Sequence, residues 1–411
     1  METTSYLTAN EAATRLGVTK NTLYAYVSRG LIRSEPGEGR TRRYVEQDVQ
    51  RLASGLTRTP RQNPADEAIP LSTSIVGIHQ GQLIYRGHDA CQLARSHSAL
   101  EVAHGLWTGS FSAPDEAEGL SVPPDVSVMA PLLSGLSPLA RMQSLLPIVQ
   151  DGGARTFDLS MTGLVRSARL IFLTLATAVS TSDAEPKSND IGRVLCSRWG
   201  HTSPAAYRSL QAAVIVSMAH PPNVDAIAAR SAATLHASLY DATLAGLSAF
   251  RGTRATGEIH RVDALFREAG DAHQLAQTIA DRQARGDDIP GFGHPAFPDG
   301  DPRARLIHQM VRTHFGGTDG AAFTVAAEQV GQDYLGQSPH LSFAMVALAR
   351  ALQLPRDAAV ALFAVARSVH WMAQAMEAIH ADESLTVEST YTGPPPTANA
   401  GDGPKRPVAA S

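Results

Sequence analysis

A short segment rich in glycine and proline most constrains how this chain can fold. Residues 291–303 read GFGHPAFPDGDPR, with three glycines and three prolines. Glycine permits backbone angles closed to other residues and proline fixes one angle, so this composition predicts an ordered loop rather than a helix or strand. A helix is expected directly afterwards, because Asp301 suits an N-cap, Pro302 suits the first helical position and residues 304–311 have helical periodicity.

The loop carries two residues suited to binding an anion. It is expected to present the imidazole of His294 and the guanidinium of Arg303 beside a helix N-terminus, an arrangement that suits a small carboxylate. The alternative is a structural loop whose histidine only satisfies backbone groups.

Most of the chain after residue 90 is predicted to be helical. Alanine and leucine recur there at helical spacing, and several segments are apolar on most faces, as expected for central helices of a bundle. The clearest segments are Met161 to Ser180, Tyr207 to Met218, Ala226 to Phe250, Phe323 to Leu335 and Phe343 to Leu352. A mainly α fold follows.

The loop resembles the signature of the citrate synthase family, G-[FY]-G-H-x-x-[FY]-x-x-x-D-P-R. Other segments fit the family in the same order, over roughly residues 70–394. These are an expected β-hairpin with Tyr85-Arg86-Gly87 and a following helix, His220 and Asn223 before Ala228-Ala229-Arg230, Leu352 to Pro355, Phe363 to Arg367, and Tyr391 to Pro394.

The resemblance implies an all-α homodimer with a large domain and a small domain at roughly residues 257–341. It also implies a ligand site of the oxaloacetate and acyl-CoA type. No bound cofactor or metal is expected, and acetyl-CoA or another acyl-CoA is a possible substrate or ligand.

Four residues match substrate-site positions of the family. His294 matches the histidine that polarises the ketone, Arg303 a carboxylate-binding arginine, His220 a further oxaloacetate contact and Arg367 another arginine of the site. The alternative for His220 and Arg367 is that they pair inside the helix bundle.

Two catalytic positions of the family are replaced here. Ala255 stands where the resemblance places the histidine that stabilises the enolate, and Ser342 where it places the carboxylate base. Thr386-Val-Glu388 replaces a basic tail segment. His260 and His340 lie near these positions in sequence and are candidates for rescue, although neither keeps the family's spacing.

The N-terminal residues predict a helix-turn-helix. Thr8 to Glu11 form a capping box before a helix at 9–16, Gly17 makes a turn, and Thr19 caps a second helix at 20–29. A glycine-flanked basic loop and a short helix at 47–52 follow. The pattern resembles the winged helix-turn-helix of MerR and excisionase types.

This unit is expected to bind duplex DNA. The start of the second helix would meet base edges, and the arginine wing would meet phosphates or a minor groove. The expected contacts are Lys20, Asn21, Thr22, Tyr24, Arg40, Arg42 and Arg43. The alternative is an appendage that only supports dimer packing, which would not need such a wing.

Charge and composition agree with two units of different character. Residues 1–62 hold ten Lys and Arg against six Asp and Glu, which gives a net charge of +4. Since the whole chain has a net charge of −4, the remaining residues carry −8. The expected organisation is a DNA-binding domain at 1–60, a linker at 61–68, a citrate-synthase-like domain at 69–393 and a disordered tail at 394–411. The start has no signal-peptide pattern, no apolar run could cross a bilayer and Cys91 and Cys196 suggest no disulfide framework, so a cytoplasmic protein is expected.

Three functions remain open from the sequence. The first is a catalytically impaired, ligand-responsive transcriptional regulator. The second is an active citrate or 2-methylcitrate synthase with a rearranged site. The third is a regulatory partner of an active paralogue in a heterodimer.

Overall fold

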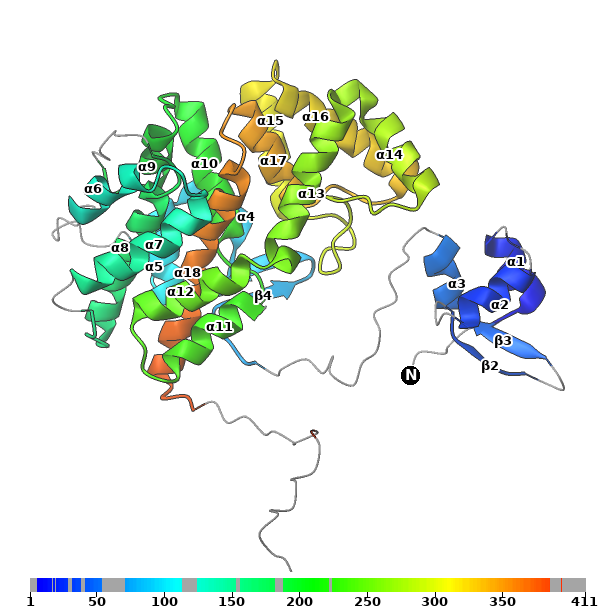
Figure 1. Cartoon of the computed structure of the whole chain (residues 1–411), viewed down its shortest axis with the longest axis horizontal. Coiled ribbons are helices and arrows are strands. Elements are labelled where there is room, and N and C mark those ends of the chain that lie inside the picture. The colour runs from blue at the N-terminus through cyan, green and yellow to red at the C-terminus, as the bar shows by residue number, and fades with distance from the viewer. Residues whose placement is uncertain are drawn as a thin grey trace, which may run out of the picture.

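The structure is a computed structural model that describes residues 6–16, 18, 20–28, 32–37, 41–53, 71–112, 124–152, 156–181, 188–221, 224–384 and 393. Its described residues form a small N-terminal unit and a large helical body (Figure 1). Within these residues, no helix is both long and apolar enough to span a lipid bilayer.

The N-terminal unit combines three helices with a small antiparallel sheet in the order β1-β3-β2. The elements are β1 (Tyr6–Thr8), α1 (Ala9–Leu16), α2 (Lys20–Ser28), β2 (Ser34–Pro36), β3 (Arg42–Val45) and α3 (Glu46–Ala53). Leu23, Ile32 and Tyr44 are buried in its core. The predicted capping box forms, because the Glu11 carboxylate accepts the Thr8 N–H at 2.8 Å and Thr8 Oγ1 accepts the Glu11 N–H at 3.4 Å.

The large body begins with a three-stranded antiparallel sheet, which confirms the predicted hairpin. Its strands are β4 (Val76–His79), β5 (Gln82–Tyr85) and β6 (His88–Asp89). Tyr85 is fully buried, and its hydroxyl accepts the Ala219 N–H at 3.0 Å and lies 3.0 Å from the Ile215 carbonyl oxygen. This contact holds the sheet against the chain that leads into His220.

Helices make up the rest of the body, as the periodicity predicts. The first group is α4 (Ala90–Ser96), α5 (Ala99–Thr108), α6 (Pro124–Leu132), α7 (Pro138–Asp151), α8 (Met161–Thr177), α9 (Ile191–Arg198), α10 (Pro204–Ser217), α11 (Val224–Ala233) and α12 (Leu239–Phe250). The last helix, α18 (Ala358–His380), packs against α5, α8, α10, α11 and α12 (Figure 1). It is buried on nearly all faces, so its apolar sequence is that of a central core helix.

One predicted helix is wrong in its extent. The sequence predicted a continuous helix from Ala226 to Phe250, whereas the structure breaks it into α11 and α12. His236 adopts a positive φ of 56°, and Ser238 then caps α12 by accepting the Asp241 N–H at 3.1 Å. The apolar pattern continues across the break because both helices pack against each other and against α18, so periodicity alone did not reveal the turn.

A second group of helices gathers at one side of the body (Figure 1). It comprises α13 (Thr253–Ala269), a 3₁₀ turn η1 (Ala272–Gln274), α14 (Leu275–Arg285), α15 (Pro302–Phe315), α16 (Asp319–Val330), a π turn η2 (Gly331–Leu335) and α17 (Leu341–Ala351). Phe266 stacks on Phe323 at a centroid distance of 4.2 Å and lies 4.6 Å from Phe343, which joins α13, α16 and α17.

Candidate functional site

The glycine–proline loop is ordered by pairing with the segment before α17. The Gly293 N–H donates to the Ser338 carbonyl at 2.9 Å, and the His340 N–H donates to the Gly291 carbonyl at 2.8 Å. An isolated β-bridge between Phe292 and Pro339 lies between these bonds. His294 and His340, far apart in the sequence, are therefore held 6.0 Å apart between ring centroids.

Glycine is required at two positions of this pairing. Gly291 and Gly293 have φ values of 92° and 67°, which other residues rarely adopt. A Cβ at Gly291 would also lie 2.9 Å from the Phe343 ring, and one at Gly293 would lie 2.6 Å from the Gln337 side chain. The glycines of the motif therefore serve close packing around the histidines.

The structure brings together the four side chains predicted to bind a substrate. The rings of His220 and His294 lie 5.4 Å apart, and the Arg303 guanidinium lies 4.8 Å from the Phe297 ring centroid, which itself is 5.2 Å from His294. Arg303 and Arg367 both lie close enough to His220 to lower its pKa. We call these four residues, His220, His294, Arg303 and Arg367, the histidine–arginine cluster.

His294 is held as a neutral hydrogen-bond donor. Its Nδ1 accepts the Ala296 N–H at 3.2 Å, which leaves the ring proton on Nε2. Burial, and next the charge of Arg303, lower the pKa of His294 to about 4. Within the described residues Nε2 makes no hydrogen bond, so a ligand oxygen could accept from it.

His220 has the opposite tautomer. Its Nδ1 donates to the Pro221 carbonyl over a long 3.3 Å, so Nε2 carries the lone pair, and that atom is buried without a partner among the described residues. Burial, followed by the charges of Arg303 and Arg367, lowers the pKa of His220 to about 3. A ligand with only acceptor oxygens would require the bond to Pro221 to break and the proton to move to Nε2.

Both arginines of the cluster already have counterions. Arg303 forms a bidentate ion pair with Asp301, with Nε–Oδ1 at 2.9 Å and Nη2–Oδ2 at 2.8 Å. Arg367 Nη2 lies 3.2 Å from Asp225 Oδ2, which also accepts the Trp371 indole N–H at 2.9 Å. The bundle pairing considered for Arg367 is therefore present, and the charges of these two arginines are balanced.

The sequence assigned Asp301 only a capping role. The structure confirms that role, since Oδ1 accepts the Arg303 N–H at 3.0 Å, and adds the ion pair and a bond from the Leu341 N–H to Oδ2 at 3.1 Å. Asp301 thus ties the start of α15 to the start of α17. The Asp-Pro-Arg sequence could have indicated the ion pair between Asp301 and Arg303, which the sequence analysis did not predict. Nothing in the sequence pointed to Asp225 as the partner of Arg367.

His340 joins the site through a carboxylate that the sequence analysis missed. Its Nδ1 accepts the Ser342 N–H at 3.2 Å, and its Nε2 lies 3.3 Å from Glu258 Oε1. Glu258 also accepts the Gly291 N–H at 2.7 Å. Burial alone would raise the pKa of Glu258, but the hydrogen bonds from His340, Arg261 and Gly291 lower it to about 2. Both nitrogens of His340 are therefore engaged in holding the loop and α17.

The two replaced catalytic positions lie beside this pair. Ala255 is one helical turn before Glu258 on α13 and is exposed, whereas Ser342 is half-buried in the first turn of α17. Neither side chain can accept a proton from carbon at neutral pH, and Ala255 has no donor. The base and enolate donor that the resemblance leads one to expect are thus absent from both positions.

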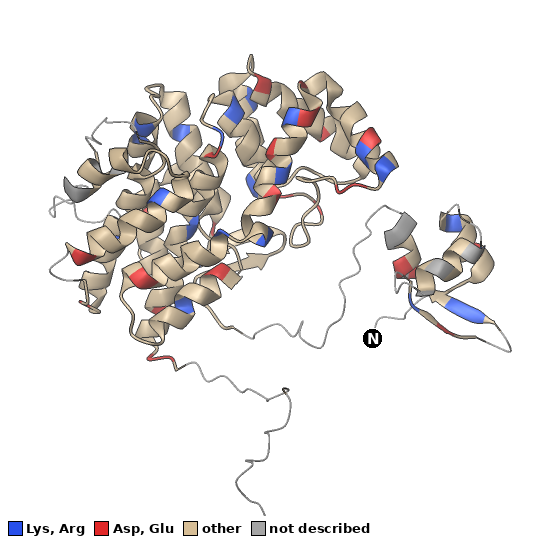
Figure 2. Cartoon of the chain, viewed as in Figure 1, with Lys and Arg blue, Asp and Glu red and all other residues tan. Residues whose placement is uncertain are grey.

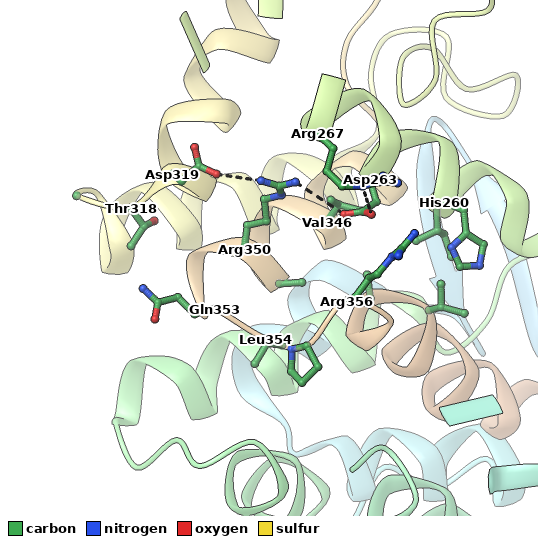
Figure 3. A pocket seen from close by; sticks show the side chains of 16 residues that line it. His260, Asp263, Arg267, Thr318, Asp319, Val346, Arg350, Gln353, Leu354 and Arg356 are labelled. Carbon is green, nitrogen blue, oxygen red and sulfur yellow. Dashed lines mark hydrogen bonds and ion pairs between the residues drawn. The ribbon is translucent and has the colours of Figure 1, made fainter. Parts of the chain in front are cut away.

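His260, the other rescue candidate, lines a different pocket. It lines, with Asp263 and Arg356, a hollow of about 690 Å³ whose walls come from α13, the start of α16, α17 and the chain that leads into α18. Figure 3 shows these three side chains around the hollow. Glu258 and Arg261 occupy another side of α13.

A further histidine lies behind the cluster and was not predicted. His370 is fully buried in α18, and burial, followed by the charges of Arg367 and His220, lowers its pKa well below the usual value. Gln374 Oε1 accepts from Arg230 at 2.8 Å, so its amide nitrogen faces His370 Nε2 at 3.2 Å. The proton must then sit on Nδ1, which has no partner among the described residues. A single histidine in an apolar helix gave no sequence signal for this donor.

The N-terminal unit presents part of the predicted DNA-binding face. Lys20 and Tyr24 are exposed one turn apart on α2, and Tyr24 is 50% exposed. Thr22 is half-buried. The side chain of Asn21 and all of Arg40 lie outside the described residues.

The two wing arginines point to opposite faces of the sheet. Arg42 shares a face with buried Tyr44 because side chains alternate along a strand, and Arg42 and Tyr24 are both close enough to affect the pKa of Tyr44. Arg43 lies on the other face, opposite Glu35 in register and 5.1 Å from the Tyr6 ring. Figure 2 shows the basic β3 beside the acidic residue of β2.

No group of three or more His, Cys, Asp or Glu side chains suited to a metal ion occurs in the described part of the chain. Cys91 and Cys196 are both buried and unbonded. Burial, the largest cause, raises the pKa of the Cys91 thiol to about 12 and that of Cys196 to about 11.

Comparison with known proteins agrees with this geometry. The C-terminal domain of citrate synthase matches residues 67–386, and a helix-turn-helix domain matches residues 6–56. The chain therefore belongs to the citrate synthase family and carries an N-terminal helix-turn-helix domain of the excisionase type.

Individual relatives are distant but match over most of their length. Citrate synthase of Haloferax volcanii is 21% identical over 350 residues, which covers 78% of this chain and 92% of the relative. Citrate synthase 2 of Bacillus subtilis is also 21% identical over 350 residues, with 79% and 94% covered.

Solved structures share the fold. The citrate synthase of Pyrobaculum aerophilum superposes with a TM-score of 0.72 at 18% identity, covering 82% of this chain and 93% of that one. A ternary complex of carboxymethyl coenzyme A and oxaloacetate with the Thermoplasma acidophilum citrate synthase gives 0.67 at 19% identity, covering 81% and 96%.

Proposed function

We propose that this chain is a DNA-binding regulator whose citrate-synthase-type body binds a di- or tricarboxylate or an acyl-CoA and lacks ordinary condensing turnover. The observation that carries the proposal is the pair of replacements at Ala255 and Ser342, combined with a DNA-binding type of domain on the same chain. Binding requires fewer groups than catalysis, and the groups retained here are those suited to binding.

Two hydrogen-bond donors of the cluster are available to such a ligand. His294 Nε2 offers a neutral N–H, and Arg303 Nη1 makes no hydrogen bond within the described residues. A carboxylate could therefore bind between them without displacing Asp301. The relative solved with oxaloacetate and a coenzyme A analogue supports testing these two ligand classes first.

The proposed active form is a homodimer, as is usual for citrate synthases. Two helix-turn-helix units in one dimer would meet half-sites about one DNA turn apart, or a multiple of it. A ligand that rotates one part of each protomer would then change how well both units fit the same duplex.

Full-length protein is expected to bind duplex DNA with a steep salt dependence, and Arg42→Ala is expected to weaken it more than Arg43→Ala. Arg42 lies on the α2 side of the sheet and can approach a phosphate. Arg43 lies on the other face, over the Tyr6 ring and opposite Glu35 in register, where the negative charge of Glu35 opposes a phosphate contact. Loss of one phosphate contact should reduce the slope of log K against log salt by about 1.

Fluorescence anisotropy at several salt concentrations measures both quantities. The two adjacent single variants serve as each other's control, since each removes one arginine from β3. Equal effects of the two substitutions, or affinity that does not change with salt, would contradict this orientation of the unit on DNA.

The second candidate function is an active citrate or 2-methylcitrate synthase. It is favoured by the retention of His294 and Arg303 and by Glu258, a carboxylate one turn from Ala255. The bonds that Glu258 makes to His340, Arg261 and Gly291 argue against it, because they lower its pKa and occupy the oxygens a base would use.

A further inference from the structure

A second cavity lies between three helices of the body and is lined by none of the residues of the histidine–arginine cluster. It has a volume of about 530 Å³, within the range of small-molecule sites, and lies between α4 and α10 on one side and α15 on the other. Arg95 and Arg208 line the first side, and His314 lines the second.

The positive charge of this cavity is not compensated by its own walls. No Asp or Glu lines it. Arg95 donates only to the Cys91 carbonyl at 3.2 Å, and within the described residues neither Arg95 nor Arg208 forms an ion pair. This differs from the cluster, where Asp301 and Asp225 balance both arginines.

Two carboxylates bonded to lining residues are committed to other contacts. Glu101 accepts the Ser98 N–H at 2.6 Å as part of a capping box, and Asp190 accepts the Tyr207 hydroxyl at 2.9 Å and caps α9. Two exposed guanidiniums in walls that hold no carboxylate form a local field that attracts anions.

The remaining walls are partly apolar. Ala94 of α4 and Leu306 and Met310 of α15 contribute carbon surface. Gln309 and Thr313, also on α15, supply polar atoms. A bare inorganic ion would leave that surface unused. A small organic molecule with two or more negative charges would fill both parts.

From this arrangement the geometry points to a second ligand site between α4, α10 and α15, which takes a multiply charged organic anion, phosphate-bearing or polycarboxylate, through Arg95 and Arg208. The two chemistries share the charge that the arginines recognise. A nucleotide-sized phosphate ester also fits the volume.

The site is placed to act on the histidine–arginine cluster. Helices α10 and α15 pack against each other. Residues 207–211 of α10 and residues 306–314 of α15 line the cavity, whereas His220 follows the end of α10 and Arg303 begins α15. An anion that ties α15 to α4 and α10 would fix the spacing of His220 and Arg303. This coupling rests on the proposed function, whereas binding at the second site does not.

Isothermal titration calorimetry of the full-length protein with ATP, pyrophosphate and citrate measures the affinity for each anion and tests the proposal. ATP, citrate or both should bind the wild type and bind at least about tenfold more weakly to Arg95→Ala/Arg208→Ala. Pyrophosphate should bind more weakly than ATP, because it lacks the organic part. Arg305→Ala, which removes an exposed arginine of α15 outside the cavity, should bind as the wild type does.

His294→Ala separates this site from the cluster. Binding that persists in His294→Ala but is lost in the Arg95/Arg208 variant supports a second site, even if the regulator function fails. Binding lost in His294→Ala and kept in the Arg95/Arg208 variant assigns the anion to the cluster and overturns the proposal. So does the absence of binding by both ATP and citrate, or, where ATP binds, an equal affinity for pyrophosphate.

Discussion

Wild-type protein is expected to release CoA from acetyl-CoA and oxaloacetate at least about 10⁴-fold more slowly than a citrate synthase with a complete site. Loss of a general base removes about 10²–10⁴ in rate. Loss of an enolate donor removes about 10²–10³ more, judged from oxyanion-hole deletions. The two losses need not multiply fully, since groups that act together are not additive.

Restoring both positions should recover part of the rate. Ala255→His adds an imidazole at an exposed position in the first turn of α13, and Ser342→Asp adds a carboxylate near the N-terminus of α17, which favours negative charge. The matched control is Arg254→His with Ser342→Asn, which places the imidazole one residue away from the required position and supplies an amide that cannot act as a base.

A coupled assay for free CoA decides the outcome. We expect turnover from Ala255→His/Ser342→Asp and none above background from the wild type or the control. Wild-type turnover near that of an ordinary citrate synthase would contradict the loss of catalysis and favour the condensing enzyme.

Replacing Arg303 with methionine is expected to lower the free energy of unfolding by about 3–5 kcal/mol, the usual cost of leaving one member of a buried ion pair alone. The side chains of Asp301 and Arg303 are 0% and 5% exposed, so water cannot replace the lost partner. The stranded carboxylate also anchors the starts of α15 and α17, so the loss should extend to both helices.

Urea denaturation of two further variants isolates the charge effect. Asp301→Asn/Arg303→Met removes both charges and should be more stable than Arg303→Met alone. Arg305→Met changes an exposed arginine on the same helix and should lie within about 0.5 kcal/mol of the wild type. If Arg303→Met were as mild as Arg305→Met, the ion pair would not exist in solution.

The fold could be predicted because its signals are local or carried by a long motif. The capping box at Thr8 and Glu11, the N-cap at Asp301 and the apolar helices all follow from neighbouring residues. The break between α11 and α12 was missed because it depends on a left-handed His236 within an unbroken apolar pattern.

The candidate site was predictable only in part, for the same reason. His220, His294, Arg303 and Arg367 were found through a resemblance that specifies residue types. Asp225, which pairs with Arg367, and Glu258, which pairs with His340, come from other helices, so only tertiary packing brings them to the site. His370 lies on the same helix as Arg367, but its burial beside the cluster also depends on packing. The opposite tautomers of His220 and His294 also depend on backbone contacts that no sequence pattern encodes.

The central claim is that a ligand of the body changes DNA binding, and the affinity of one duplex with and without ligand tests it most directly. The duplex is selected from a random pool by the wild-type protein and measured by anisotropy with oxaloacetate, citrate or acetyl-CoA. His294→Ala is the binding-deficient control, since Arg303 variants are expected to be unstable. Typical coupling of about 1–3 kcal/mol predicts a change of about 5- to 150-fold in wild type and none in His294→Ala. Unchanged DNA affinity with every acid and acyl-CoA would contradict the account.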